Sequence, residues 1–290
     1  MSWLETILLG VLQGATEFLP VSSSGHLTLL QNLFGLQEPQ TLFDLCLHLG
    51  TLVAVAWFFR GFLCELLCGA AGWLKAVTLR RRPDDVQSGA ARIILLMAVS
   101  TVVTGLMGFT IGHQVKEFCA NPHAVGSFMM VTGVMLLATH PALPWMRRSS
   151  EPRPLSLMPW WQALVIGFIQ GLSASFRGIS RSGSTITTGR VLGLTPDDAA
   201  RFSFLLFFPA IIGGTVVEMR HGWPAGESAE PLNALVGGLV AMGVGLIALR
   251  FLLAVLRKGS FFWFGPYCLL VGVFAILALW VLFRTAERRR

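Results

Sequence analysis

Six long apolar runs constrain this chain more than any other feature. They are Phe43 to Phe59, Ile93 to Ile111, Ala124 to Ala138, Phe202 to Val217, Leu232 to Leu256 and Phe261 to Phe283. About 20 helical residues cross the roughly 30 Å of a bilayer core, and shorter runs reach across with flanking residues or by tilting. Since 54% of the residues are hydrophobic and only 13% are charged, we predict an all-α integral membrane protein.

Two further segments, roughly 3–36 and 159–194, are apolar at their ends and rich in Gly, Ser and charge in the middle. This pattern is typical of helix–loop–helix hairpins that enter and leave a membrane on one side. The segments are also similar to each other, with one inserted residue near Gly178. The matched pairs are Gly10 with Gly167, Gln13 with Gln170, Gly14 with Gly171, Ser23 with Arg181, Gly35 with Gly193 and Leu36 with Leu194.

Basic clusters predict which ends of the spans face the cytoplasm. The clusters are Lys75 to Arg92, Arg147 to Arg153 and Arg257 to Lys258. Two proposed spans lie between each cluster and the next. By the positive-inside rule all three are cytoplasmic, which makes the two hairpins enter from opposite sides. The basic tail Arg284 to Arg290 would then lie outside, against the rule.

Two related hairpins of opposite orientation indicate an inverted-topology repeat, whose hairpin tips meet near the membrane midplane. We therefore predict one membrane domain, residues 1–290, with a first repeat of about 1–150 and a second of about 151–290. It would contain about six transmembrane helices and two re-entrant hairpins. The net charge of +7 lies mainly in loops and the tail, so we read it as topology and expect no nucleic-acid partner.

The first hairpin carries a carboxylate, Glu17, and an imidazole, His26. Such groups are costly at membrane depth unless they face a wet cavity or each other. Pro20 ends the first half of the hairpin, and the turn that follows contains Ser22, Ser23, Ser24 and Gly25. These residue types can supply a nucleophile, a base and a metal ligand. The alternative is that Ser22 only caps a helix and His26 is a satisfied interior histidine.

The second hairpin has the composition of an anion site. Small residues that lead into a helix present backbone N–H groups and the positive end of the helix dipole, and Arg181 adds a planar fork of donors. Phosphate oxygens match these groups. The candidate residues are Arg177, Gly178, Ser180, Arg181, Ser182, Gly183, Ser184 and Thr185.

Together the hairpins resemble one family, the undecaprenyl-pyrophosphate phosphatases of the bacitracin-resistance type. The resemblance rests on the block from Gly14 to His26 and the block from Ser180 to Ile186, with secondary matches at Phe43 to Thr51 and Arg201 to Leu206. It implies removal of the terminal phosphate of a C55 isoprenyl diphosphate, in the plasma (inner) membrane of a bacterium. It also implies an inverted-repeat fold, a divalent cation such as Mg²⁺ or Ca²⁺, and an isoprenyl diphosphate lipid as substrate; a homodimer is a further expectation.

Carried over by position, the resemblance gives Glu17 a metal-binding role and Arg181 a diphosphate-clamping role. Ser23 or His26 would be nucleophile or base, and water activated by His26 is an open alternative. The hydroxyls of Ser180, Ser182 and Thr185 would hold phosphate oxygens, with further substrate contacts expected from Gln13, Ser22, Ser24, Arg177, Gly178 and Gly183. Two departures stand out. Gln13 replaces an acid that many members have, and Arg177–Gly178 replaces Pro–Gly.

Three alternatives concern the whole chain or its other polar residues. A transporter or flippase for polyprenyl phosphate would also use an inverted repeat with a midplane site. A second lipid-phosphatase pattern fits Lys75 to Pro83, but its blocks come in the wrong order and Thr187 stands where it needs His, so we interpret Lys75 to Pro83 as a basic cytoplasmic loop. Asp44 and His48, four residues apart, either line the cavity or only pack.

Overall fold

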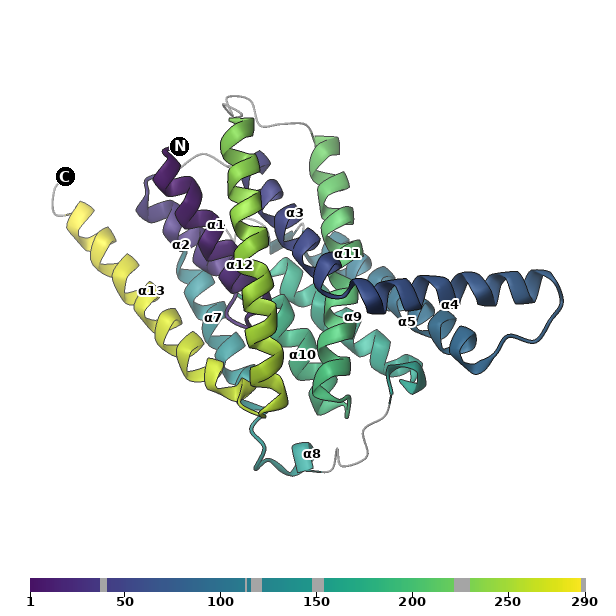
Figure 1. The fold of residues 1–290 in the computed structure, drawn as a ribbon. Coiled ribbons are helices and arrows are strands. Elements are labelled where there is room, and N and C mark those ends of the chain that lie inside the picture. Colours follow the sequence, from purple (N-terminus) through teal and green to yellow (C-terminus); the bar gives the residue numbers. More distant parts are fainter. Residues whose placement is uncertain (37–40, 113, 116–121, 148–153, 222–229, 288–290) are drawn as a thin grey trace.

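The computed structural model describes residues 1–36, 41–112, 114–115, 122–147, 154–221 and 230–287, and all regular secondary structure in these ranges is helical (Figure 1). The all-α prediction is therefore confirmed. The elements are α1 (Trp3–Phe18), α2 (Ser23–Leu33), α3 (Thr41–Phe58), α4 (Arg60–Thr78), α5 (Asp85–Met107), η1 (Gly108–Gly112), α7 (Pro122–Leu137), α8 (Pro144–Arg147), η2 (Leu155–Leu157), α9 (Trp160–Ser175), α10 (Arg181–Val191), α11 (Pro196–His221), α12 (Pro231–Arg257), η3 (Phe261–Trp263) and α13 (Phe264–Glu287).

Four helical segments within the described ranges are long and apolar enough to cross a membrane: Arg60–Thr78, Asp85–Gly112, Pro196–Val217 and Pro231–Arg257. Shorter apolar helices cover Leu42–Phe58, Ala124–Leu137 and Phe261–Leu277. Each of the six apolar runs of the sequence falls on one of these helices. One helix, Arg60–Thr78, has no corresponding run and was not predicted from the sequence. Residues 148–153 and 288–290, parts of two predicted basic segments, lie outside the described residues.

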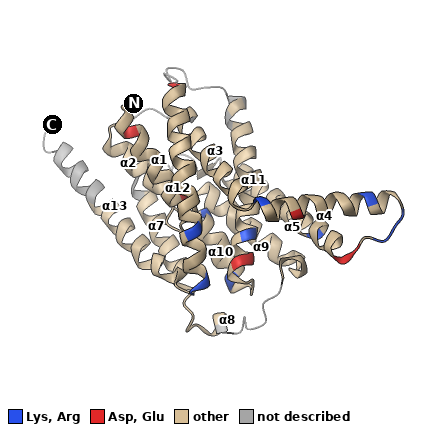
Figure 2. Cartoon of the chain, in the orientation of Figure 1, with Lys and Arg blue, Asp and Glu red and all other residues tan. Residues whose placement is uncertain are grey.

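The predicted loop from Lys75 to Pro83 is wrong for residues 75–78, which belong to α4, whereas residues 79–83 do connect α4 to α5. Asp84 then caps α5, accepting a hydrogen bond from Gln87 N at 2.7 Å, and this capping box starts α5 before the predicted Ile93. The α4 helix and the first part of α5 form an arm that projects from the bundle (Figure 1), and basic residues gather at its far end (Figure 2).

Matched glycines of the two hairpins allow equivalent close helix crossings. A Cβ atom at Gly10 of α1 would lie 2.8 Å from Gly237 O of α12, and one at its match, Gly167 of α9, would lie 2.5 Å from Ser100 O of α5. Small residues let membrane helices approach this closely. The hairpins thus pack against their neighbouring helices in the same way, which is consistent with the repeat; the repeat itself stays a prediction.

The two hairpin tips meet inside the bundle. In Figure 1 the α1–α2 hairpin lies in the upper part, near the N-terminus, and α9–α10 lies in the lower part. The Ser182 hydroxyl of α10 lies 3.3 Å from both Glu17 O and Leu19 O, carbonyls at the end of α1 that lack helical partners. Phe18, buried beside them, packs edge-on against Phe204 of α11 with ring centroids 5.7 Å apart. Burial of Phe18 therefore fixes the position of its neighbour Glu17.

Candidate active site

Glu17 lies in the last turn of α1 and is almost completely buried, with a side chain 2% exposed. Gln13, one turn earlier on the same face, donates from Nε2 to Glu17 Oε2 at 2.9 Å. The Pro20 segment that follows stops the helix, so Glu17 stands at a helix end beside the hairpin turn. A hydrogen bond within α1 therefore already orients the Glu17 carboxylate.

Ser22 orients the second half of the first hairpin. Its backbone is left-handed, with φ 67°, and its hydroxyl accepts a hydrogen bond from Gly25 N at 3.2 Å as the cap of α2. Ser23 is consequently the first residue of α2, and its hydroxyl donates to Glu17 Oε2 at 2.5 Å. A carboxylate accepts the hydrogen of the candidate nucleophile, which is the arrangement of a general base with its hydroxyl.

The second hairpin repeats this local design with a different side chain. Ser180 caps α10 by accepting from Gly183 N at 3.0 Å, so that Arg181 becomes the first helical residue. Arg181 Nη2 forms a hydrogen-bonded ion pair with Glu17 Oε1, and its guanidinium lies 4.2 Å from the ring centroid of Phe207. The two residues that the repeat matches, Ser23 and Arg181, therefore meet on opposite oxygens of one carboxylate.

Thr132 of α7 stabilises the turn of the second hairpin. Its hydroxyl donates to Gly178 O at 3.1 Å and accepts from Ser180 N at 2.9 Å. Gly178 has φ +103°, and a Cβ atom there would lie 2.4 Å from Val125 O, so only glycine fits. The sequence predicts Gly178 as a substrate contact; in the structure its backbone helps to place Arg181.

A cavity of about 250 Å³ opens between the tips. Its lining includes the first residues of both α2 and α10, so the N-terminal ends of two helix dipoles border one space. Arg177, Arg181 and one carboxylate, Glu17, give the lining an excess of positive charge. Such a space suits a phosphate group. The lining residues are Glu17, Ser22, Ser23, Ser24, His48, Ser173, Ala174, Arg177, Ile179, Ser180, Arg181 and Ser182.

The remaining predicted site residues do not line this cavity: Gln13, His26, Gly178, Gly183, Ser184 and Thr185. Gly183 packs tightly against the other hairpin, because a Cβ atom there would lie 3.1 Å from Pro20 Cβ. The Thr185 hydroxyl donates to Arg181 O of its own helix at 2.8 Å. The same oxygen lies 2.6 Å from the Ser203 hydroxyl, and this contact joins α10 to α11. Both residues support the position of Arg181 through packing and hydrogen bonds.

His26 is directed toward α13. Its Nδ1 lies 2.9 Å from Ser22 O, so this nitrogen carries a hydrogen, and its Nε2 lies 2.9 Å from the hydroxyl of Tyr267. The His26 and Tyr267 rings are parallel, with centroids 5.9 Å apart. Both imidazole nitrogens are occupied, and the hydrogen-bond partner of Ser23 is Glu17. Tyr267 is the single tyrosine of the chain, and this rarity is the sequence signal that could have marked it.

His48 of α3 is the imidazole that lines the cavity. Its Nε2 lies 3.9 Å from Glu17 Oε2, while its Nδ1 is 2.7 Å from Asp44 O and donates to that carbonyl. From the sequence, His48 either lines the cavity or only packs, and its spacing of four residues from Asp44 is the available signal. The structure selects the cavity position for His48.

The donor set offers limited ligation for a divalent cation. Among the residues that the structure describes, no group of three or more His, Cys, Asp and Glu side chains is arranged to hold a metal. Gln13 Oε1, however, is buried without a hydrogen-bond partner, and Glu17 lies one turn away. Mg²⁺ commonly takes one or two carboxylates and completes its shell with substrate phosphates and water. Glu17 and the Gln13 carbonyl fit that pattern if diphosphate oxygens supply the other ligands.

The fold and the site define an all-α membrane protein in which a buried acid, a hydroxyl and two arginines border one cavity with an excess of positive charge. The family model described as bacitracin resistance protein BacA matches residues 6–274. The chain belongs to this family.

Curated relatives agree over nearly their whole length. The undecaprenyl-diphosphatase of Desulfatibacillum aliphaticivorans is 43% identical over 97% of this chain and 100% of the relative. That of Desulforapulum autotrophicum is 38% identical over 96% and 99%. That of Korarchaeum cryptofilum is 36% identical over 95% and 98%.

Proposed function

We propose that this protein hydrolyses undecaprenyl diphosphate to undecaprenyl phosphate and inorganic phosphate, which recycles the lipid carrier of cell-wall glycan synthesis. The name shared by its relatives supports this reaction. The single observation in the structure that carries it is the placement of Ser23 and Arg181 on the two oxygens of Glu17. Anion binding alone does not require a buried acid hydrogen-bonded to a hydroxyl.

The diphosphate binds in the cavity between the hairpin tips in this proposal. Arg181 moves from Glu17 to the phosphate oxygens, and Arg177, which is exposed at the cavity wall, adds a second positive charge. The N-terminal N–H groups of α2 and α10 neutralise further charge. The isoprenyl tail lies among the apolar helices, so only the headgroup needs to enter the polar cavity.

The first chemical step joins Ser23 to the terminal phosphorus. As its Oγ attacks, the bond between phosphorus and the bridging oxygen breaks, undecaprenyl phosphate leaves, and the Ser23 proton passes to Glu17 Oε2, its hydrogen-bond acceptor at 2.5 Å. The 2.9 Å hydrogen bond from Gln13 Nε2 orients the same carboxylate oxygen. The structure favours Glu17 over His26 as the base, because His26 makes its hydrogen bonds to Ser22 and Tyr267.

The second step hydrolyses the phosphoserine. Water adds its hydroxyl to phosphorus, its proton ends on Ser23 Oγ, and Glu17 releases its own proton to solvent. His48, with Nε2 3.9 Å from Glu17 Oε2, is placed to relay protons between that carboxylate and the cavity. Direct attack by water with Glu17 as the base is the alternative; it needs no phosphoserine.

A divalent cation is the proposed cofactor, Mg²⁺ or Ca²⁺. Glu17 and Gln13 would hold it with their side-chain oxygens. When bound, such an ion withdraws electron density from phosphate oxygens and makes phosphorus more electrophilic.

A transporter that moves the lipid without hydrolysis is the second candidate, since paired hairpins with a central site also occur in transporters. Phosphate release by the purified protein in detergent micelles separates the two, because sidedness vanishes there. Release that requires Ser23 supports hydrolysis, and undiminished lipid binding without release supports transport. Multi-pass insertion in the plasma membrane of a bacterium and a homodimer stay predictions; cell fractionation and light scattering test them.

A further inference from the structure

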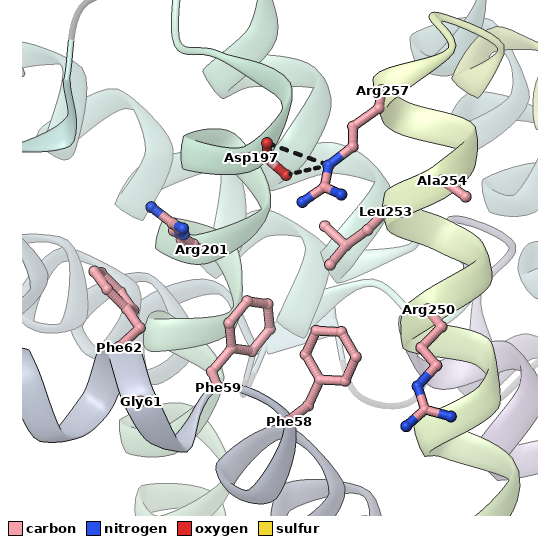
Figure 3. A pocket seen from close by; sticks show the side chains of 10 residues that line it. All are labelled: Phe58, Phe59, Gly61, Phe62, Asp197, Arg201, Arg250, Leu253, Ala254 and Arg257. Carbon is pink, nitrogen blue, oxygen red and sulfur yellow. Dashed lines mark hydrogen bonds and ion pairs between the residues drawn. The ribbon is translucent and has the colours of Figure 1, made fainter.

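A second and larger cavity, of about 410 Å³, lies apart from the candidate active site. We call it the arginine pocket; it is lined by Phe58, Phe59, Gly61, Phe62, Asp197, Arg201, Arg250, Leu253, Ala254 and Arg257 (Figure 3). It shares no lining residue with the cavity between the hairpin tips. The proposed reaction therefore leaves it without a role.

The arginine pocket lies where two candidate spans end. The α11 helix begins at Pro196, next to Asp197, and α12 ends at Arg257. Ends of membrane helices lie at the headgroup level of a bilayer. Arg250 stands seven residues before Arg257, about 10 Å further along the helix axis at 1.5 Å per residue. The pocket thus runs from the headgroup level toward the acyl chains.

Positive charge in the pocket exceeds its local compensation. Arg257 Nε is paired with Asp197, at 2.9 Å from Oδ1 and 3.3 Å from Oδ2 (Figure 3). Arg201 makes a looser ion pair, with Nη1 3.8 Å from Asp198 Oδ1, and its guanidinium lies over the Phe62 ring, 5.0 Å from the ring centroid. Within the described residues Arg250 has no hydrogen bond or ion pair.

An arginine near the edge of the hydrocarbon region needs a counter-anion or a route to water. The exposed Arg250 lies on a helix face that also carries the exposed Ala254 and, on the pocket side, the buried Leu253. Three phenylalanines, Phe58, Phe59 and Phe62, form the opposite wall (Figure 3). A ligand that fills this space must therefore combine an anion with apolar chains.

We propose that the arginine pocket binds the phosphate headgroup of an anionic phospholipid from the surrounding bilayer. Arg250, which has no partner among the described residues, holds the phosphate oxygens, and the phenylalanine wall contacts the glycerol and upper acyl chains. Basic pockets between membrane helices are known to hold such headgroups. Free inorganic phosphate would use the arginines but would leave the apolar wall empty.

The test uses the purified full-length protein in a neutral detergent. Thermal unfolding and native mass spectrometry are followed while phosphatidylglycerol, phosphatidylcholine or inorganic phosphate is added. We expect retention of phosphatidylglycerol and a rise in the melting temperature, with the apparent affinity about tenfold weaker in Arg250→Gln because one charge-assisted contact is lost. Lys75→Gln, an equal charge change at the exposed end of α4, should bind like the unmodified protein.

Arg250→Lys, which keeps the charge, should restore most of the affinity and shows whether a defect in the Gln variant is general misfolding. Equal binding of phosphatidylcholine, an equal loss in Lys75→Gln, or no loss in Arg250→Gln would overturn the proposal. Displacement of the lipid by millimolar inorganic phosphate would also overturn it, in favour of a free-anion site. Phosphate release is measured in the same samples and should be unchanged by Arg250→Gln, so failure of the proposed reaction is distinguishable from failure of the lipid site.

Discussion

Arg181 and Glu17 form an ion pair between the tips of the two hairpins, although the residues are 164 positions apart in the sequence. Both lie at helix ends, Glu17 at the end of α1 and Arg181 at the start of α10. The pair neutralises two charges at the centre of an apolar bundle and, in the proposed reaction, exchanges the Glu17 carboxylate for substrate phosphate as the partner of Arg181.

The first prediction concerns this pair. Glu17→Gln should lower phosphate release at least about 100-fold, because the proton acceptor for Ser23 is lost. It should also lower the melting temperature, since removal of one partner from a buried pair costs about 3–5 kcal/mol. The double variant Glu17→Gln, Arg181→Gln should regain stability yet stay inactive. Glu5→Gln, a change at the opposite end of the same helix where Gln can keep the capping hydrogen bond, is the control; activity that survives in Glu17→Gln would refute the assignment.

The second prediction identifies the nucleophile. Ser23→Ala should reduce phosphate release about 100-fold or more, and acid-quenched protein should lose the label it acquires from substrate labelled in the terminal phosphate. Thr28→Ala, five residues further along α2 where the hydroxyl donates to Ser24 O at 2.8 Å, should keep both activity and label. Undiminished release in Ser23→Ala would instead select direct attack by water.

The third prediction compares the two histidines. His48→Gln should lower kcat at least about tenfold, because His48 lines the cavity beside Glu17. His26→Gln should have a smaller effect and should resemble Tyr267→Phe, since these two residues form one hydrogen-bonded pair at 2.9 Å. Steady-state phosphate release for the three variants decides the order. A larger defect in His26→Gln than in His48→Gln would contradict the geometry.

The fourth prediction concerns Thr132. Thr132→Val keeps the shape of the side chain but leaves Gly178 O and Ser180 N without their partner, so the free energy of unfolding should fall by about 1–3 kcal/mol for each buried group. Thr101→Val is a matched control, because the Thr101 hydroxyl bonds within its own helix, to Met97 O at 2.8 Å. Thermal unfolding in detergent measures both; equal melting temperatures would show that the turn does not depend on Thr132.

The fifth prediction addresses the proposed cation. Gln13→Glu places a second carboxylate beside Glu17, where Gln13 Nε2 now donates at 2.9 Å. Two adjacent carboxylates repel unless a cation or a proton lies between them, so the variant should need less divalent ion for half-maximal activity. Titration of phosphate release with Mg²⁺ and Ca²⁺ after chelation provides the measurement. A variant with an unchanged or weaker ion requirement would place the cation away from Gln13.

The helices were largely predictable from local sequence. Apolar runs give the spans because backbone groups in lipid must bond internally, and Pro20 with the serines after it predicts where the first hairpin turns. The apolar pattern does not predict the α4 helix of the arm, because Arg60–Thr78 has a mean hydropathy of 1.2, the lowest of the four candidate spans. Lys75 begins a basic cluster in the sequence, but α4 continues past it to Thr78, so the start of the cluster does not mark the end of the helix.

Local sequence alone did not determine which polar groups meet. The sequence named Glu17, Ser23, His26 and Arg181 as a set, and three of these lie together. His26 turns toward Tyr267, whose position depends on the packing of α13 241 residues later in the chain. His48 reaches the cavity only because α3 and α1 both pack on α12.

The sequence by itself determined that this protein is an all-α membrane protein of the bacitracin resistance family, and it predicted the site residues in two hairpins. These properties follow from apolar length, turn residues and local motifs, which act over a few residues at a time. Only the tertiary structure decided that Glu17, and not His26, accepts the hydrogen of Ser23. Close helix crossings at glycines such as Gly14 and Gly167 bring the hairpins to within hydrogen-bond distance, and such contacts depend on all the packed helices at once.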